Sequence, residues 1–124
     1  MKLTFYSVDK FNEKVIFNVD YENPTTSSFE FIDKSIKNTK ILLNIIDNES
    51  VKFTRIGDIN MDLLLILGKE TNAYYKNNIG LEFEFTVYTK YISISNNKIE
   101  IEYDINVMDN KNTFKITIMF HKNS

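Results

Sequence analysis

The sequence predicts an all-β protein, a single antiparallel β-barrel of the calycin or lipocalin type with about eight to ten short strands. Three observations support this prediction. Apolar residues alternate with polar ones at period two along most of the chain, and turn-forming residues separate the alternating runs at short intervals. No stretch has the i, i+3, i+4 apolar spacing of an amphipathic helix. Because hairpin follows hairpin along the chain, a barrel is favoured over a Greek-key sandwich.

The composition is that of a small globular protein. We expect one domain over residues 1–124, since this length supports one substantial core. Ten Phe and seven Tyr favour strands. A net charge of −2 without a basic stripe argues against nucleic acid as a partner. The sequence has no cysteine and no run near the roughly 18 apolar residues of a membrane span, so we predict a cytoplasmic protein with no membrane partner.

The first half of the chain predicts two hairpins and a loop between them. Residues 3–5 and 15–21 alternate on either side of a DKFN turn. Residues 21–28 contain the only proline among small polar residues, which predicts an irregular loop and makes this segment the best candidate for a mobile lid. A short strand at 29–31 follows, and then a hairpin of residues 41–46 and 51–55 around the turn DNE.

The stretch from Ile56 to Phe85 contains all three glycines of the protein, Gly57, Gly68 and Gly80. Glycine adopts positive φ without steric cost, so each is expected at a turn. Between these turns we predict strands at residues 60–67 and 73–76.

A change of parity marks the strand that begins after Gly80. Its apolar residues occupy odd positions up to Val87, but further along they are Ile92 and Ile94. A slip of one residue moves every side chain to the other face, so we predict a bulge or corner between Tyr88 and Tyr91. Two strands at 99–107 and 114–120 complete the chain.

These parities assign eleven large side chains to the barrel interior. They are Phe17, Phe31, Leu43, Phe53, Met61, Leu63, Phe85, Ile101, Tyr103, Ile116 and Ile118.

The motifs GDINM and AYYKNNIG, followed by Thr89, resemble the pattern of the YwiB family of small bacterial proteins of unknown function. Gly57 and Met61 match a glycine followed four residues later by methionine, and Tyr74 and Tyr75 match the aromatic pair of that family. The turn at residues 77–79 is Asn-Asn-Ile, where the family usually has Thr, Pro and an aromatic residue. The resemblance extends over nearly the whole chain, implies a calycin-like barrel and supplies no activity.

Motifs that carry chemistry are weak. The single histidine, His121, has no sequence partner for a triad or metal site and is expected to be an exposed strand residue. Glu82, Glu84, Glu100, Glu102 and Asp104 could suggest a glycosidase pair, but they alternate on outward positions, which is typical of a solvated face. The segment GKET lacks the second glycine and the helix of a phosphate loop. We therefore predict no catalytic residue, no metal, no cofactor and no enzymatic activity.

Arg55, the only arginine, is the exception. If the parity of Val51 and Phe53 continues, its side chain points into the barrel, where it requires hydrogen-bond partners or a ligand anion. The alternatives are that a bulge before Gly57 turns it outward or that it stacks on an aromatic ring at the barrel end. The inward orientation predicts a modest pocket at one barrel mouth, formed by Phe53, Arg55, Met61, Tyr75 and Tyr103.

Two functions remain open from the sequence. The first is a barrel that binds a small apolar or amphipathic ligand with an anionic head, and the second is a structural or protein-interaction module whose barrel is filled. The interior volume distinguishes them. We also predict a homodimer, because a group of outward apolar residues forms a candidate contact patch: Leu42, Ile46, Leu64 and Ile66.

Overall fold

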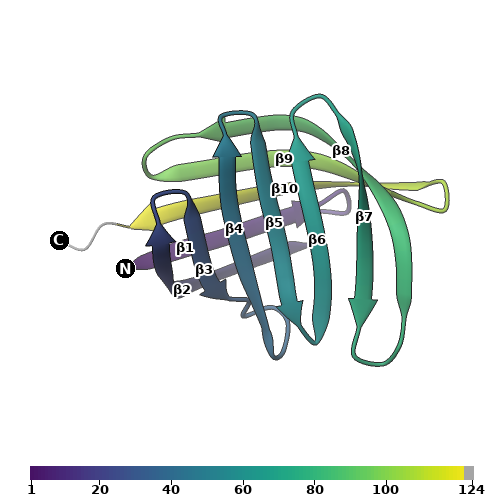
Figure 1. Ribbon diagram of the computed structural model, residues 1–124, viewed down its shortest axis with the longest axis horizontal. Coiled ribbons are helices and arrows are strands. Elements are labelled where there is room, and N and C mark those ends of the chain that lie inside the picture. The colour runs from purple at the N-terminus through teal and green to yellow at the C-terminus, as the bar shows by residue number, and fades with distance from the viewer. Residues whose placement is uncertain (122–124) are drawn as a thin grey trace.

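The computed structural model describes residues 1–121 and shows a closed antiparallel barrel of ten strands (Figure 1). Each strand pairs with its neighbours in sequence, and β1 pairs with β10 to close the barrel. Residues 1–121 contain no helix, and so none that is long and apolar enough to cross a membrane. The all-β antiparallel barrel predicted from the sequence is confirmed. The strands are β1 (Lys2–Asp9), β2 (Lys14–Thr25), β3 (Ser28–Ile32), β4 (Thr39–Asp47), β5 (Ser50–Gly57), β6 (Ile59–Ile66), β7 (Glu70–Asn77), β8 (Glu82–Ile94), β9 (Lys98–Val107) and β10 (Asn110–His121).

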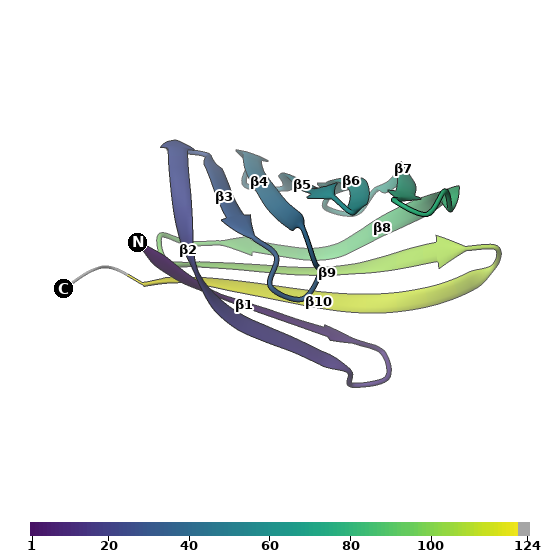
Figure 2. The ribbon, with the colours of Figure 1, turned by 90° about the horizontal axis from the view of Figure 1, so that it is seen from below.

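The barrel is flattened into two layers whose strands cross steeply. Figure 2 shows β3 to β7 on one side and β1, β9 and β10 on the other. Two long strands connect the layers. β2 pairs with β1 over Lys14–Asp20 and with β3 from Tyr21 onward, while β8 pairs first with β7 and then with β9. These two strands therefore turn the corners of the barrel.

The interior is packed with the side chains that the parities predict. Nine of the eleven are buried, and Phe17 and Met61 are half-buried against the same core. Phe5 lies at the centre of an aromatic cluster, with ring centroids 5.0 Å from Phe17, 6.1 Å from Phe31 and 6.4 Å from Phe53. Removing each such ring from water contributes about 2 kcal/mol to folding.

The predicted bulge in β8 is confirmed. Thr89 pairs with Tyr103 and Tyr91 with Glu102, so Lys90 is the extra residue. Its Nζ lies 3.0 Å from Oδ1 of Asp104, a buried carboxylate that also accepts a hydrogen bond from Thr113. Burial raises the pKa of Asp104, but the bonds from Thr113 and two lysines outweigh burial and lower it. The bulge therefore places a cation over this carboxylate.

The loop predicted at residues 21–28 is wrong, and with it the lid. Residues 21–25 complete β2, and β3 begins at Ser28. Pro24 lies between Glu22 and Thr25, where the register of the β2–β3 ladder shifts. A proline fits at such an irregularity because no ladder bond requires its missing N–H. The hairpin is therefore paired where the composition indicated a loop.

The apolar patch expected to support a dimer is divided in the structure. Leu42 and Ile46 lie on β4, Leu64 and Ile66 lie on β6, and β5 runs between them. The outward side chains of β5 at these positions are polar: Ser50, Lys52 and Thr54. Self-association remains a prediction, but this patch is not continuous.

We expect Gly57→Ala to destabilise the barrel far more than Gly80→Ala. Gly57 has φ 144°, and an added Cβ would lie 1.9 Å from the backbone oxygen of Asn38. Gly80 has φ 89° but open space around it. Positive φ alone costs about 1 kcal/mol, and overpacking adds about 2 kcal/mol at Gly57 only. Urea unfolding of both variants measures the difference, and equal losses would contradict the steric argument.

Candidate functional site

The structure places three of the five predicted pocket residues side by side. Arg55 on β5 is opposite Met61 on β6, and Met61 is opposite Tyr75 on β7. Phe53, two residues before Arg55, is fully buried. Tyr103 on β9 is 3% exposed. The positive charge of Arg55 acts on the Tyr103 hydroxyl from across the interior. Arg55, Met61 and Tyr75 are therefore cross-strand neighbours, and Phe53 and Tyr103 are buried in the core.

Arg55 points into the barrel. Its partner across the β4–β5 ladder is Ile41, which is fully buried, so both side chains lie on the inner face. The Arg55 side chain is 15% exposed, and its guanidinium lies 5.0 Å from the ring centroid of Phe53. The Arg55 side chain therefore points inward and also stacks on an aromatic ring, although the sequence left these two arrangements as alternatives.

Asp33, which no sequence pattern singled out, is the partner of Arg55. Its side chain is fully buried, and its Oδ2 accepts a hydrogen bond from Nε of Arg55 at 3.0 Å. Its Oδ1 accepts hydrogen bonds from the backbone N–H and the hydroxyl of Ser35 at 2.9 and 2.5 Å. The Asp-x-Ser spacing is a signal for a local turn of this kind. The chain thus supplies its own anion to Arg55.

Two of the predicted pocket residues, Tyr75 and Tyr103, each stack on a phenylalanine ring. Tyr75 stacks on Phe83 with ring centroids 4.8 Å apart, and Tyr103 stacks on Phe114 at 5.7 Å. Burial raises the pKa of Tyr103 to about 12, and the charge of Arg55 opposes this shift only in part. The uncharged form of the Tyr103 hydroxyl is therefore favoured.

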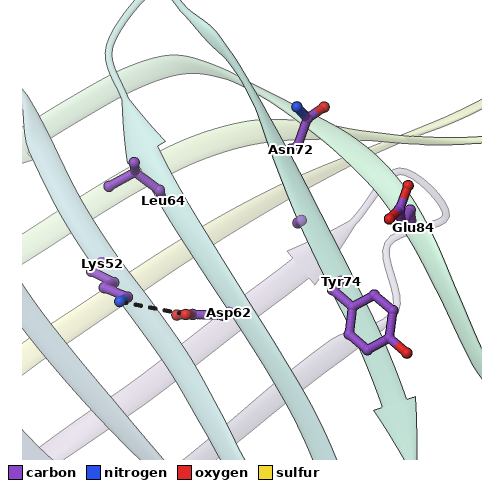
Figure 3. A pocket seen from close by; sticks show the side chains of 7 residues that line it. Lys52, Asp62, Leu64, Asn72, Tyr74 and Glu84 are labelled. Carbon is purple, nitrogen blue, oxygen red and sulfur yellow. Dashed lines mark ion pairs between the residues drawn. The ribbon is translucent and has the colours of Figure 1, made fainter.

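A hollow of about 590 Å³ lies on the outer surface, where strands β6 and β7 separate (Figure 3). The two strands pair from Ile59–Asn77 to Asp62–Tyr74, and beyond this point the ladder ends. We call this feature the β6–β7 hollow. Its lining comprises Lys52, Asp62, Leu64, Asn72, Ala73, Tyr74 and Glu84.

The β6–β7 hollow combines an apolar surface with separated charges. Leu64 is 36% exposed, while Lys52 and Asp62 form an ion pair of 3.4 Å at one side. Tyr74 donates a hydrogen bond to Glu82, which raises the pKa of the phenol. Glu84 has no ion-pair partner among residues 1–121. The arrangement suits a partner group that carries a positive charge beside an apolar side chain.

Four further hollows of about 140 to 280 Å³ also open on the outer surface. None of these five hollows includes a predicted pocket residue in its lining. The pocket at the barrel end stays a prediction. Within residues 1–121 no group of three or more His, Asp or Glu side chains is placed to hold a metal ion. His121 is exposed on the last strand, as predicted, with Nε2 2.7 Å from the Thr4 hydroxyl.

Comparisons with known proteins agree on the fold and name no activity. Residues 9–118 match the model of a family described as a domain of unknown function (DUF1934). The crystal structure of the ywiB protein from Bacillus subtilis is similar, with a TM-score of 0.68 and 20% sequence identity over 98% of this chain and 91% of that one. No curated protein matches the sequence.

We expect Arg55→Met and Asp33→Asn each to cost about 3 kcal/mol of stability, because each leaves one buried charge without its partner. The double variant should cost less than the sum, since both charges are then removed. Urea unfolding of the three variants gives the coupling free energy. Additive losses would show that the two side chains do not stabilise each other.

We expect the Tyr103 hydroxyl to make folding stability depend on alkaline pH. The unfolded tyrosine titrates near 10 and the folded one near 12, so the unfolded state loses its proton first. The contribution is complete below pH 10 and falls as pH rises to 12, by about 2 kcal/mol. Comparing the pH dependence of unfolding for the native protein and Tyr103→Phe isolates this effect, and identical curves would refute it.

Proposed function

The chain belongs to the DUF1934 family, whose description names no activity, and from this premise we propose that it is a non-enzymatic protein-interaction module with a filled barrel. Its partner is an extended protein segment that binds the β6–β7 hollow through a Lys or Arg next to an apolar side chain. The observation that carries this proposal is the contrast between an interior whose single arginine is neutralised by Asp33 and an amphipathic hollow on the outside.

The interior supports a filled barrel. A barrel of about eight strands is either filled by side chains or holds one small ligand, and the balance depends on the bulk of the inward residues. Here the inner face carries a cluster of four phenylalanines, and Phe5 and Phe53 have no exposed surface. A ligand anion at Arg55 would compete with a carboxylate that the fold already holds at 3.0 Å.

The chemistry of the β6–β7 hollow supports the choice of partner. Asp62 is already engaged by Lys52 and by the Thr54 hydroxyl, so Glu84 is the carboxylate available to an incoming cation. Leu64 offers the neighbouring apolar contact. A segment with only apolar residues would contact Leu64 and leave Glu84 unpaired, and one with only cationic residues would pair with Glu84 and leave Leu64 without an apolar contact.

A second candidate is the amphipathic ligand with an anionic head at the barrel end. One observation favours it: Arg55 uses Nε for Asp33, and its two terminal amino groups donate no hydrogen bond to residues 1–121. Such a ligand would bind across Met61 and Tyr75, which are half-buried. We infer a cytoplasmic location from the cysteine-free sequence, and this location is compatible with both candidate functions.

We expect display of random peptides on the purified protein to enrich segments with Lys or Arg adjacent to an apolar residue. Leu64→Glu and Glu84→Lys should each weaken the binding of such a peptide about tenfold, because each removes one half of the recognition. Matched substitutions elsewhere on the outer surface, Ile32→Glu and Glu22→Lys, should leave the affinity unchanged. Fluorescence polarisation measures all four.

The second candidate predicts a different pattern. Fatty-acid titration and native mass spectrometry would show saturable binding that Arg55→Met abolishes and that Glu84→Lys leaves intact. That result, together with no enrichment of peptides, would overturn the interaction module in favour of the ligand-binding barrel.

A further inference from the structure

Among residues 1–121, no strand pairs with one edge of the first half of β2. Residues Lys14–Asp20 pair with β1 on one side, but β3 joins β2 only from Tyr21 onward. The first half of β2 therefore extends past the point where the barrel closes. In both views it is the border strand of its layer, outside β1 (Figures 1 and 2). This feature, residues 14–20 of β2, is called the free edge.

The direction of the backbone groups along the free edge follows from two contacts. The N–H of Tyr21 donates to the backbone oxygen of Met1, so odd residues of β2 face β1. The backbone oxygen of Asn18 accepts a hydrogen bond from Nζ of Lys34, so even residues face away from β1. Because these directions alternate along a strand, Lys14, Ile16, Asn18 and Asp20 direct their backbone groups to the free edge, where the side chain of Lys34 occupies the oxygen of Asn18 in the monomer.

Exposed apolar side chains lie on and next to the free edge. Ile16 is 67% exposed on the outer face, and Phe11, in the turn that precedes the strand, is 70% exposed. Val15 and Phe17 on the inner face are only half-buried. Unpaired backbone groups beside exposed apolar side chains make a strand edge a template for pairing with another strand.

We propose that a second copy of this chain covers the free edge, with the two β2 strands pairing antiparallel about a twofold axis. The opposite charges near the two ends of the free edge favour a second copy of the chain over another extended segment. They also set the register in which the two β2 strands pair. With Phe17 at the axis, Lys14 of one copy lies opposite Asp20 of the other, and this pair occurs twice. Both side chains are exposed and available for it, since Asp20 is 79% exposed despite its 3.4 Å contact with Lys2. An isologous contact of this kind closes at two copies.

The contact is small. Pairing over seven residues, with Ile16 of each copy, buries less surface than the roughly 1,600 Å² of a standard interface. A reversible dimer that dissociates on dilution is therefore expected. This proposal uses a surface separate from the β6–β7 hollow, so its test is independent of the proposed function.

Analytical ultracentrifugation over a concentration series tests the dimer. Ile16→Pro removes a backbone donor from the free edge while the bonds to β1, which odd residues make, remain. It should raise the dissociation constant at least about tenfold. Ile16→Lys should act in the same direction. Ile46→Lys is the matched control, because Ile46 is 57% exposed on β4, which β3 separates from β2, and it should have no effect.

Charge exchange tests the register. Lys14→Glu and Asp20→Lys should each weaken the dimer, because each places like charges opposite one another twice. The double variant restores opposite charges at both pairs and should recover most of the affinity. Amide hydrogen exchange gives a second readout, since the N–H groups of Ile16 and Asn18 should become protected only as the concentration rises.

Three outcomes would overturn the proposal. The first is a protein that stays monomeric at several hundred micromolar. The second is a dimer that Ile16→Pro and Ile16→Lys leave intact, which would place the contact on another surface. The third is a dimer in which the double charge exchange restores nothing, because the predicted register is then wrong.

Discussion

The structure depends on the two strands that serve both layers of the barrel. A closed sheet requires each strand to be paired on both sides, yet the layers cross steeply, so β2 and β8 must change partners along their length. In β8 the change is made by one extra residue, Lys90, and in β2 by an irregularity that contains Pro24. Bulges bend a strand and increase its twist, which is what a barrel corner requires.

The surfaces on which the two proposals rest both lie where strand pairing stops. There backbone hydrogen bonds between strands are lost and side chains of the outer face spread apart. The β6–β7 hollow lies where one ladder stops at Asp62 and Tyr74, and the free edge of β2 lies where β3 is too short to follow it. Loss of strand pairing therefore marks both of the surfaces on which the proposals rest.

The interior shows how a charge is tolerated in such a core. A guanidinium among aromatic rings needs both a counter-charge and hydrogen bonds, and the short connection between β3 and β4 supplies them through Asp33 and Ser35. The pair also ties the β3–β4 connection to β5 at the end of the barrel. Arg55 thus has a structural role whether or not its remaining donors meet a ligand.

The sequence by itself determined the fold class, the inward faces of the strands and the bulge near Lys90, because side-chain parity is a local property that a single strand carries along its length. For Arg55 it left the inward orientation as one of several alternatives, between which the structure decided. It did not predict Asp33 as its partner, 22 residues away, because the pairing depends on how β3 and β4 are joined in space. It misjudged residues 21–28, since the same Pro and small residues are compatible with a loop and with a bulged hairpin. The β6–β7 hollow and the free edge were decided only by the tertiary structure, because both exist where strands distant from a given residue stop pairing.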